Sequence, residues 1–391
     1  MNKALISFTL LLAPVALIGV YAPVPQPEQG SAVTVSLIGG VHYDTNVLGS
    51  PTDEIESAVY LLNPRIMVGQ GTDSQTSFTG YYDLKAFFYS DRPTQDSLYN
   101  HEVNGTLNHQ FSEAARLLVS DTYYVIDDPE SIDAGILQTD QSLDRNRFNA
   151  RLRFDASEQV NVVLKYRNNN LGYDNSDLAV LLDRNESRAG FELGYQMQPN
   201  ARLVFEYRYQ QIQYDVSATL KDSESSFFLG GFDWDPSPKT KISTRFGLED
   251  RDRSVSTDDS SANATVMVLH KYDNRSFFSL GVSYDIQETT NPVNYSDEEV
   301  LAFFANIQHA LSGSVYLGAS VYYDDVELRP QAATTKINYN ALRIGFNLTY
   351  EPRPSWSVIF SLDYDDVSSS DIFRVQDRLR IGVSARYSFG L

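Results

Sequence analysis

The sequence predicts an all-β protein, a transmembrane antiparallel up-and-down β-barrel of about 18 strands. Its last stretch alternates between apolar and basic residues, as a strand does when one face meets lipid and the other meets water. Two-strand units separated by turns recur along the chain about every 40 residues. The first residues form an apolar segment of the kind that directs export. Together these observations favour a barrel in an outer membrane.

Residues 373–391 are expected to be the strand that closes the barrel. Neighbouring side chains of a strand point to opposite faces, so residues of one parity share a face. One face carries four arginines, and the other ends in Tyr387, Phe389 and Leu391, which we expect to act as the signal for barrel assembly. A soluble sheet shows the same alternation, so the number of further strands and the export signal decide between the two classes.

Composition narrows the class of protein. Of 391 residues, 42% are hydrophobic and 12% aromatic, yet beyond the first residues no apolar run reaches the roughly 20 residues that a membrane-spanning helix needs. A β-barrel requires no such run, because only alternate residues face lipid. The sequence has no cysteine, which excludes disulfides and thiol chemistry. The net charge of −20 argues against binding nucleic acid.

An export signal is expected at residues 1–22, because Lys3 precedes an apolar stretch at residues 4–20. Cleavage after Ala22 is unfavourable because Pro23 follows, and a later site near residue 32 is the alternative. Residues 23–32 are expected to form a short periplasmic segment, and residues 33–391 the barrel. The expected location is the outer membrane of a Gram-negative bacterium. Outer-membrane lipid, lipopolysaccharide and the barrel-assembly machinery are the expected partners.

Turns of unequal length divide the chain into strands. Long polar connections, such as residues 127–141, 250–260 and 288–297, alternate with short turns, which is typical of outer-membrane barrels. Two strands for each short turn, together with a first strand at residues 33–43 and a last strand at residues 373–391, give 18, an even number. The alternative is 16, because residues 222–234 and 256–273 alternate poorly. The short turns lie at residues 71–74, 112–114, 157–158, 198–200, 236–239, 273–274, 311–314 and 352–355.

A Tyr-Asp pair recurs at the far end of the outgoing strands. Tyrosine at the headgroup level followed by an acid entering water indicates a membrane boundary. The alternative is an ordinary tyrosine-rich strand that ends in a loop acid. The pairs begin at Tyr43, Tyr173, Tyr214, Tyr284, Tyr323 and Tyr364.

The main competing fold at this repeat length is a β-propeller, whose blades of about 40 to 50 residues hold four short strands. Residues 277–287 and 339–350 each run on without the extra turn that a blade needs. Two long strands per repeat therefore favour the barrel.

The residues 40–46, with sequence GVHYDTN, the Tyr-Asp hairpins and the closing Tyr387-Ser388-Phe389 resemble Gram-negative outer-membrane porin-like barrels. The resemblance is greatest to the β-barrel porin type 2 family. Members of that family are often linked to exopolysaccharide secretion, so the resemblance implies a polysaccharide-related pore. The chain departs from the family at its end, because such barrels commonly end on Phe whereas this sequence ends Phe389-Gly390-Leu391.

Catalytic and metal chemistry find little support in the sequence. The five histidines, at positions 42, 101, 109, 270 and 309, fall in different expected strands and in no catalytic motif. His109 and His309 share the parity of the expected lipid face, near short turns. No metal-binding histidine pattern and no phosphate-binding loop is present. We therefore expect neither an enzyme nor a bound cofactor or metal.

Four consecutive expected strands turn ten cations and only three acids, Glu186, Glu192 and Glu206, toward the lumen. The closing strand contributes further arginines, and Lys241 and Arg245 belong to the same face of their strand. The expected lumen and substrate track comprises Arg145, Arg147, Arg151, Arg153, Lys165, Arg167, Arg184, Arg188, Arg202, Arg208, Arg374, Arg378, Arg380 and Arg386.

Two interpretations of this wall are open. The cations either pair with acids and stiffen a large barrel, or they form a track for carboxylate or sulfate groups. The second interpretation predicts an outer-membrane channel that passes or exports an anionic saccharide or exopolysaccharide. A plugged structural or adhesive barrel without transport is the alternative. External acids could repel an exported anion outward or bridge to lipopolysaccharide through divalent cations; they include Asp127, Asp128, Glu130, Asp133 and Asp140.

Overall fold

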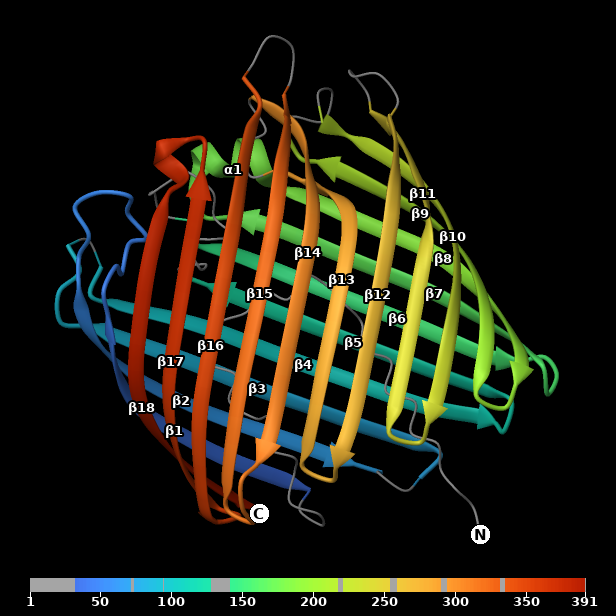
Figure 1. Ribbon diagram of the computed structural model, residues 1–391, viewed down its shortest axis with the longest axis horizontal. Coiled ribbons are helices and arrows are strands. Elements are labelled where there is room, and N and C mark those ends of the chain that lie inside the picture. The colour runs from blue at the N-terminus through green and yellow to red at the C-terminus, as the bar shows by residue number, and fades with distance from the viewer. Residues whose placement is uncertain are drawn as a thin grey trace.

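The chain forms a closed barrel of eighteen antiparallel strands in which each strand pairs with its neighbours in sequence and the first pairs with the last (Figure 1). The computed structural model describes residues 32–71, 74–93, 95–127, 141–216, 221–253, 259–289, 294–330 and 335–390. The strands are β1 Val33–Asp44, β2 Ser57–Gln70, β3 Thr76–Tyr89, β4 Ser97–Ser112, β5 Ala115–Ile126, β6 Leu143–Asp155, β7 Val160–Tyr173, β8 Arg184–Gln198, β9 Ala201–Tyr214, β10 Ser223–Ser237, β11 Thr240–Arg253, β12 Asp259–Asp273, β13 Ser276–Glu288, β14 Tyr295–Ala310, β15 Val315–Pro330, β16 Ile337–Arg353, β17 Trp356–Ser369 and β18 Gln376–Gly390. A helix, α1 Ser176–Leu182, and a 3-10 turn, η1 Ile372–Arg374, accompany them.

The expected all-β barrel and its closing strand are confirmed. β18 pairs with β1 from Arg380 to Gly390, for example Phe389 with Val35 and Tyr387 with Leu37. Closure removes the open sheet edge, so backbone groups are satisfied within the barrel. An ion pair reinforces the seam, because the Arg378 Nε and Nη2 atoms donate to the Asp44 carboxylate at 3.0 and 2.6 Å.

The start of the closing strand was predicted wrongly. β18 begins at Gln376 rather than at residue 373, because Ile372–Arg374 form η1, in which the Arg374 amide donates to the Asp371 carbonyl. Arg374 therefore reaches the barrel mouth from a turn. Leu391, the last residue of the expected assembly signal, lies outside the described residues.

The short turns lie where the sequence placed them, between the strands of each pair from β2 to β17. The poorly alternating stretches are strands β10 and β12, so the barrel has eighteen strands and not sixteen. Two long connections are shorter than expected. β11 continues to Arg253, and β14 already begins at Tyr295, because charged residues there join the sheet ladder instead of a loop.

The outer face is apolar and the inner face polar. Alternate residues such as Leu37, Phe205 and Phe360 are exposed, while their strand neighbours on the other face are buried or half-buried. A closed barrel with an apolar exterior satisfies its backbone internally and meets lipid with its side chains. The architecture is that of a transmembrane barrel of a Gram-negative outer membrane. The export signal and most of the 23–32 segment lie outside the described residues.

The repeated Tyr-Asp mark is only partly a membrane boundary. Tyr43 and Tyr323 are exposed on the outer face, as expected. Tyr214 is buried on the inner face, because it shares the parity of inward-facing Glu206. Asp44 and Asp365 are also buried, and they pair with arginines of β18 instead of entering water. No described helix is long and apolar enough to cross a membrane.

Candidate functional site

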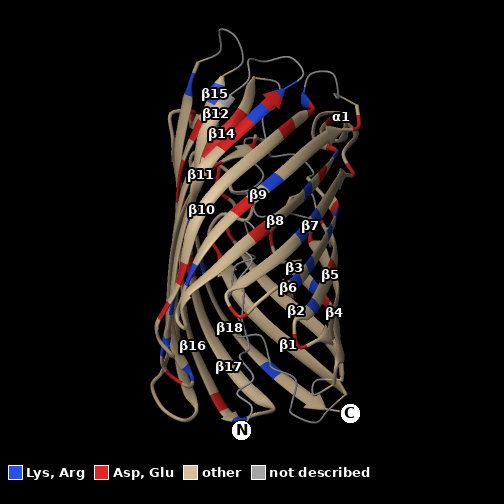
Figure 2. Cartoon of the chain, turned by 90° about the vertical axis from the view of Figure 1, so that its right-hand side faces the viewer, with Lys and Arg blue, Asp and Glu red and all other residues tan. Residues whose placement is uncertain are grey.

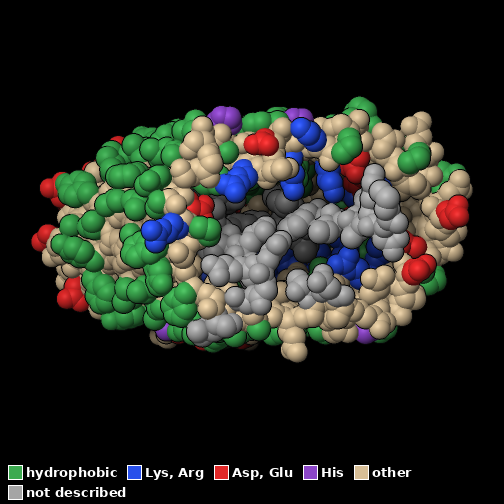
Figure 3. Space-filling model, turned by 90° about the horizontal axis from the view of Figure 1, so that it is seen from below, with side chains coloured by type: hydrophobic (Ala, Val, Ile, Leu, Met, Phe, Trp, Pro, Cys, Tyr) green, Lys and Arg blue, Asp and Glu red, His purple; other side chains and the backbone are tan. Residues whose placement is uncertain are grey.

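The candidate site is the inner wall of the barrel. Seen from the end that carries both termini, the molecule has an elongated outline with a hollow centre, and Lys and Arg side chains gather inside it (Figure 3). Charged segments are visible on β7, β8 and β9, and others lie at the upper end of β14 (Figure 2). Alternation directs these side chains inward, because the apolar residues of the same strands occupy the lipid face.

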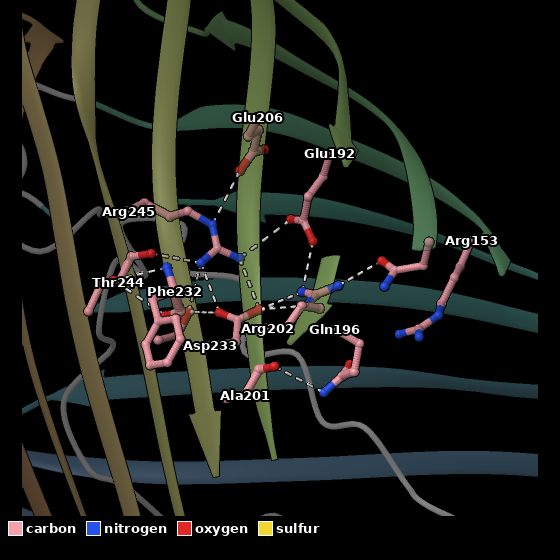
Figure 4. Close-up of polar contacts among 12 residues, drawn as sticks. Arg153, Glu192, Gln196, Ala201, Arg202, Glu206, Phe232, Asp233, Thr244 and Arg245 are labelled. Atoms are coloured by element: carbon pink, nitrogen blue, oxygen red, sulfur yellow. Dashed lines mark hydrogen bonds and ion pairs between the residues drawn. The ribbon is translucent and has the colours of Figure 1, made fainter. Parts of the chain in front are cut away.

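One group of inward-facing cations forms ion pairs with carboxylates of the inner wall. Glu192 and Glu206 lie directly opposite each other on β8 and β9, both 1% exposed. Lys165 binds both, with its Nζ atom 2.7 Å from Glu192 and 2.8 Å from Glu206. Arg202 and Arg245 close the network through Asp233 (Figure 4). The shared cations offset the repulsion between two buried carboxylates.

Other expected track residues are paired in the same manner, each with one acid at 2.6 to 2.9 Å. Three of these pairs join residues of one strand and two join neighbouring strands, and all of them leave little free charge for a solute. The pairs are Arg153 with Asp155, Arg184 with Glu186, Arg208 with Glu206, Arg378 with Asp44 and Arg380 with Asp365.

A second group of cations makes no ion pair among the described residues. We call this group the basic wall: Arg145, Arg147, Arg151, Arg167 and Arg188, on β6, β7 and β8. Arg145 donates to the Asn169 amide oxygen at 2.8 Å, and Arg188 to the Gln210 amide oxygen at 2.7 Å. The Nε atom of Arg147 is buried and finds no hydrogen-bond partner within the described residues. Amides accept hydrogen bonds but do not neutralise charge.

The register of the strands brings like charges together in the basic wall. Arg167 lies directly opposite Arg188, and Arg151 lies directly opposite Lys165. Like charges at directly opposite positions destabilise a sheet. The facing cations lower the stability of the barrel, and their guanidinium groups point into the lumen. Such groups are suited to bind an anion that moves through the lumen.

Two remaining track residues lie elsewhere. Arg374 is buried in η1, with its guanidinium 5.2 Å from the centre of the Tyr339 ring. Arg386 is buried on the inner face of β18. Neither lies on the strands of the basic wall, so the structure divides the expected track into paired cations, a basic wall and distant members.

A charged cluster at the barrel mouth was missed by the sequence reasoning. Arg251 of β11 contacts Glu249, Glu288 and Asp297 at 2.9, 3.0 and 2.7 Å. Arg253 contacts Glu288 at 3.1 Å and also binds Asp297. We call these five residues the mouth cluster. Arg251 and Arg253 continue the parity of Lys241 and Arg245, a signal that was overlooked because the region was assigned to a loop.

The helix α1 and Lys221 lie at the same end of the barrel. The Asn175 side chain caps α1 by accepting from the Asp177 amide, and Leu178 and Leu182 are buried. The Lys221 Nζ atom donates to the Leu181 carbonyl at 2.6 Å and lies 5.1 Å from the Tyr214 ring centre. Burial of the ammonium group lowers the pKa of Lys221 to about 8.

Metal and histidine chemistry gain no support from the geometry. Among the described residues, no group of three or more metal-ligating side chains converges. His109 contacts the Thr76 hydroxyl at 2.7 Å, and His309 contacts the Tyr272 hydroxyl at 3.0 Å, both near the short turns. These contacts fit interfacial packing.

Comparison with known proteins gives no family. No protein-family model and no curated protein sequence matches the chain. Similar solved structures include the outer membrane protein opdK from Pseudomonas aeruginosa, with 12% identity, a TM-score of 0.47 and coverage of 91% of this chain and 99% of that one. OccAB3 of Acinetobacter baumannii has 10% identity, a TM-score of 0.47 and coverage of 93% and 100%.

The siderophore receptor PirA from Acinetobacter baumannii is also similar, with 9% identity, a TM-score of 0.48 and coverage of 93% of this chain and 81% of that one. Likeness at this level assigns neither a substrate nor an activity. The function is therefore argued from the residues of the chain itself.

Proposed function

We propose that the protein is an outer-membrane, porin-like channel that passes anionic solutes along the basic wall. The observation that supports the proposal is the direct opposition of Arg167 and Arg188 without a carboxylate partner among the described residues. Guanidinium groups bind carboxylates and sulfates through paired hydrogen bonds, and they stay charged at every physiological pH. Several weak sites in sequence permit a solute to enter and to leave.

We further propose an acidic saccharide as the solute class. Between the arginines lie the amides of Asn149, Asn169 and Gln210, which share the inner face and accept or donate hydrogen bonds. Amides suit sugar hydroxyl groups, and guanidinium groups suit sugar carboxylates. The resemblance to type 2 porins points to an exopolysaccharide, which stays a prediction. We propose no catalytic role.

The test is the ion selectivity of the purified protein in planar bilayers, measured as the reversal potential in a salt gradient. We expect anion preference in the parent protein and a shift toward cations in Arg147→Gln/Arg167→Gln. The matched control is Lys336→Gln/Arg353→Gln, which removes two exposed cations outside the basic wall. An unchanged reversal potential in the first variant would remove the basic wall from the pathway.

A closed structural barrel is the second candidate, and one observation favours it. The mouth cluster joins β11 to β13 and β14 with buried ion pairs, so part of the mouth is occupied by the chain itself. A closed barrel would give no current in the same bilayers. The two candidates therefore separate in one experiment.

A further inference from the structure

The outer part of the β13–β14 hairpin departs from the regular barrel. β13 pairs with β12 only as far as Tyr284, opposite Ala264, whereas β12 continues along β11 to Asp259. The pairing between β13 and β14 nevertheless extends to Glu288 and Asp297. Beyond Tyr284, β13 thus pairs with β14 but not with β12, and β14 pairs with β15. Figure 1 shows β13 curving away from β12 at this end.

The detached part of the hairpin lies against the inner wall. Arg251 belongs to the inner face of β11, and its Nη2 atom donates to the Ile286 carbonyl at 3.2 Å, two strands away. Ile286 is 5% exposed, although Leu280 and Val282 of the same parity are exposed to the outside. On the facing wall, Ser261 of β12 is 8% exposed. The contacts of Arg251 with Ile286, Glu288 and Asp297 therefore place the outer part of the hairpin over the inner wall at β11 and β12.

Further anchors come from strands across the mouth. The Tyr214 hydroxyl of β9 donates to the Glu288 carboxylate at 2.7 Å, which spans four strands of the sheet. The Tyr339 hydroxyl of β16 donates to Glu298 at 3.1 Å. A small apolar cluster packs Tyr295 and Val300 of the hairpin against Val326 and Leu328 of β15. The anchors on the β9 and β11 side are therefore polar, and those on the β15 side are mainly apolar.

Some polar groups of the mouth cluster, which hold the hairpin on the β11 side, lack hydrogen bonds in the part of the chain that the structure describes. The Oε2 atom of Glu249 and the Nε atom of Arg253 are buried and have no hydrogen-bond partner among the described residues. A buried polar atom without a partner costs free energy, so the closed arrangement is not the best that these groups can make. The hairpin also gives up its ladder bonds to β12. Both features favour a second position of the hairpin.

We propose that the β13–β14 hairpin is a latch and that Arg251 and Arg253 form an anion site, which Glu288 and Asp297 occupy when the latch is closed. The proposal rests on the proposed channel for acidic saccharides. The carboxylates of the hairpin have the chemistry of the solute, so a solute with two carboxylates replaces the ion pairs by others of the same kind. Exchange of like contacts leaves a small difference in free energy between closed and open states.

The absence of cysteine from the sequence permits a direct test. Ser261→Cys is a small change that places one thiol on the inner wall, directly opposite Glu249 of the mouth cluster, at a hydroxyl without a hydrogen-bond partner in the described part of the chain. The full-length protein in lipid vesicles is treated with a membrane-impermeant maleimide, and the rate of labelling is followed by mass. We expect slow labelling in this background. Adding Glu288→Gln/Asp297→Asn should speed labelling about tenfold or more, because the latch opens.

The control and the ligand arm sharpen the test. Asp53→Asn/Glu54→Gln removes two exposed carboxylates from the connection between β1 and β2 and should leave the labelling rate unchanged. Trigalacturonate should speed labelling in the parent background, and neutral maltotriose should not. Equal labelling rates with and without Glu288 and Asp297 would overturn the latch, as would a rate that trigalacturonate does not change.

Bilayer current separates this inference from the proposed function. Glu288→Gln/Asp297→Asn without the cysteine should carry a larger current than the parent protein. Anion-selective current combined with unchanged labelling would reject the latch and keep the channel. If Glu288→Gln/Asp297→Asn speeds labelling but the protein carries no current in the bilayer, the latch is supported and the channel is rejected.

Discussion

The inner faces of β6 to β8 and of β8 to β11 carry the same residue types and yet behave differently. In the second region Glu192 and Glu206 face each other and bind Lys165 between them. In the first, Arg167 faces Arg188 with no acid between them. The difference arises from the register of the strands, because the register decides which inner-face side chains lie opposite or near one another. A count of charges along a strand therefore does not reveal whether a wall is neutralised.

The two regions should also respond differently to mutation. Removing one member of a buried ion pair leaves the other charge without compensation, whereas removing one of two facing arginines relieves repulsion. The paired region should thus lose stability on mutation, and the basic wall should lose selectivity.

The largest expected effect is on Glu206, which is 1% exposed and binds Lys165 and Arg208. Glu206→Gln should lower the free energy of unfolding by about 3 to 5 kcal/mol, because two cations lose their buried partner. Urea unfolding in detergent measures the change. The control Glu327→Gln breaks an exposed pair with Lys336 and should cost about 1 kcal/mol or less. Equal losses in both variants would contradict the distinction between buried and exposed pairs.

Block of the current by an acidic oligosaccharide should depend on salt. Raising the ionic strength from about 0.1 M to about 1 M shortens the screening length from about 10 Å to about 3 Å. We expect block by trigalacturonate to weaken by about tenfold, which corresponds to about 1.4 kcal/mol. Block by neutral maltotriose should stay constant. Salt-independent block by both sugars would show that the charge of the basic wall does not act on the solute.

A charge reversal at Arg188 should convert the basic wall into a paired wall. Arg188→Glu places a carboxylate opposite Arg167, so the free energy of unfolding should rise by about 0.2 to 1 kcal/mol while anion preference falls. Arg188→Gln should lie between this variant and the parent protein in both measurements. A loss of stability in Arg188→Glu would mean that the two side chains do not meet as the register implies.

The smallest expected effect concerns Lys221, a cation that belongs to neither region. Burial lowers its pKa to about 8 from the ordinary 10.5, so between these pH values the unfolded chain binds more protons than the folded one. Stability should therefore rise slightly as pH rises through this window, and this component should vanish in Lys221→Gln. Urea midpoints at several pH values measure it, with Lys336→Gln as the control. A rise that persists unchanged in Lys221→Gln would assign it to another group.

From the sequence alone, about 18 strands were predicted, with 16 as the alternative, together with the short turns and the inner face of the basic strands β6 to β9. These properties are local: alternation has a period of two, and turn residues mark where a strand ends. Thus Arg147 and Arg167 could be directed to the inner face without any knowledge of their neighbours. The same local logic gave Tyr43 its outward position, and it placed Tyr214 wrongly because one parity was assumed for all six pairs.

The three-dimensional arrangement of the strands determines which cations pair with acids and that the β13–β14 hairpin lies at the mouth. Whether Lys165 meets Glu206 depends on the stagger of three strands, and that stagger is set by pairings between distant residues. The inward turn of the β13–β14 hairpin depends on β13 leaving β12 after Tyr284, which no local pattern encodes. The alternation of residues is a local pattern that can be read along the chain. The pairing of charges depends on distances between residues that are far apart in sequence, and these distances are set only by the folded barrel.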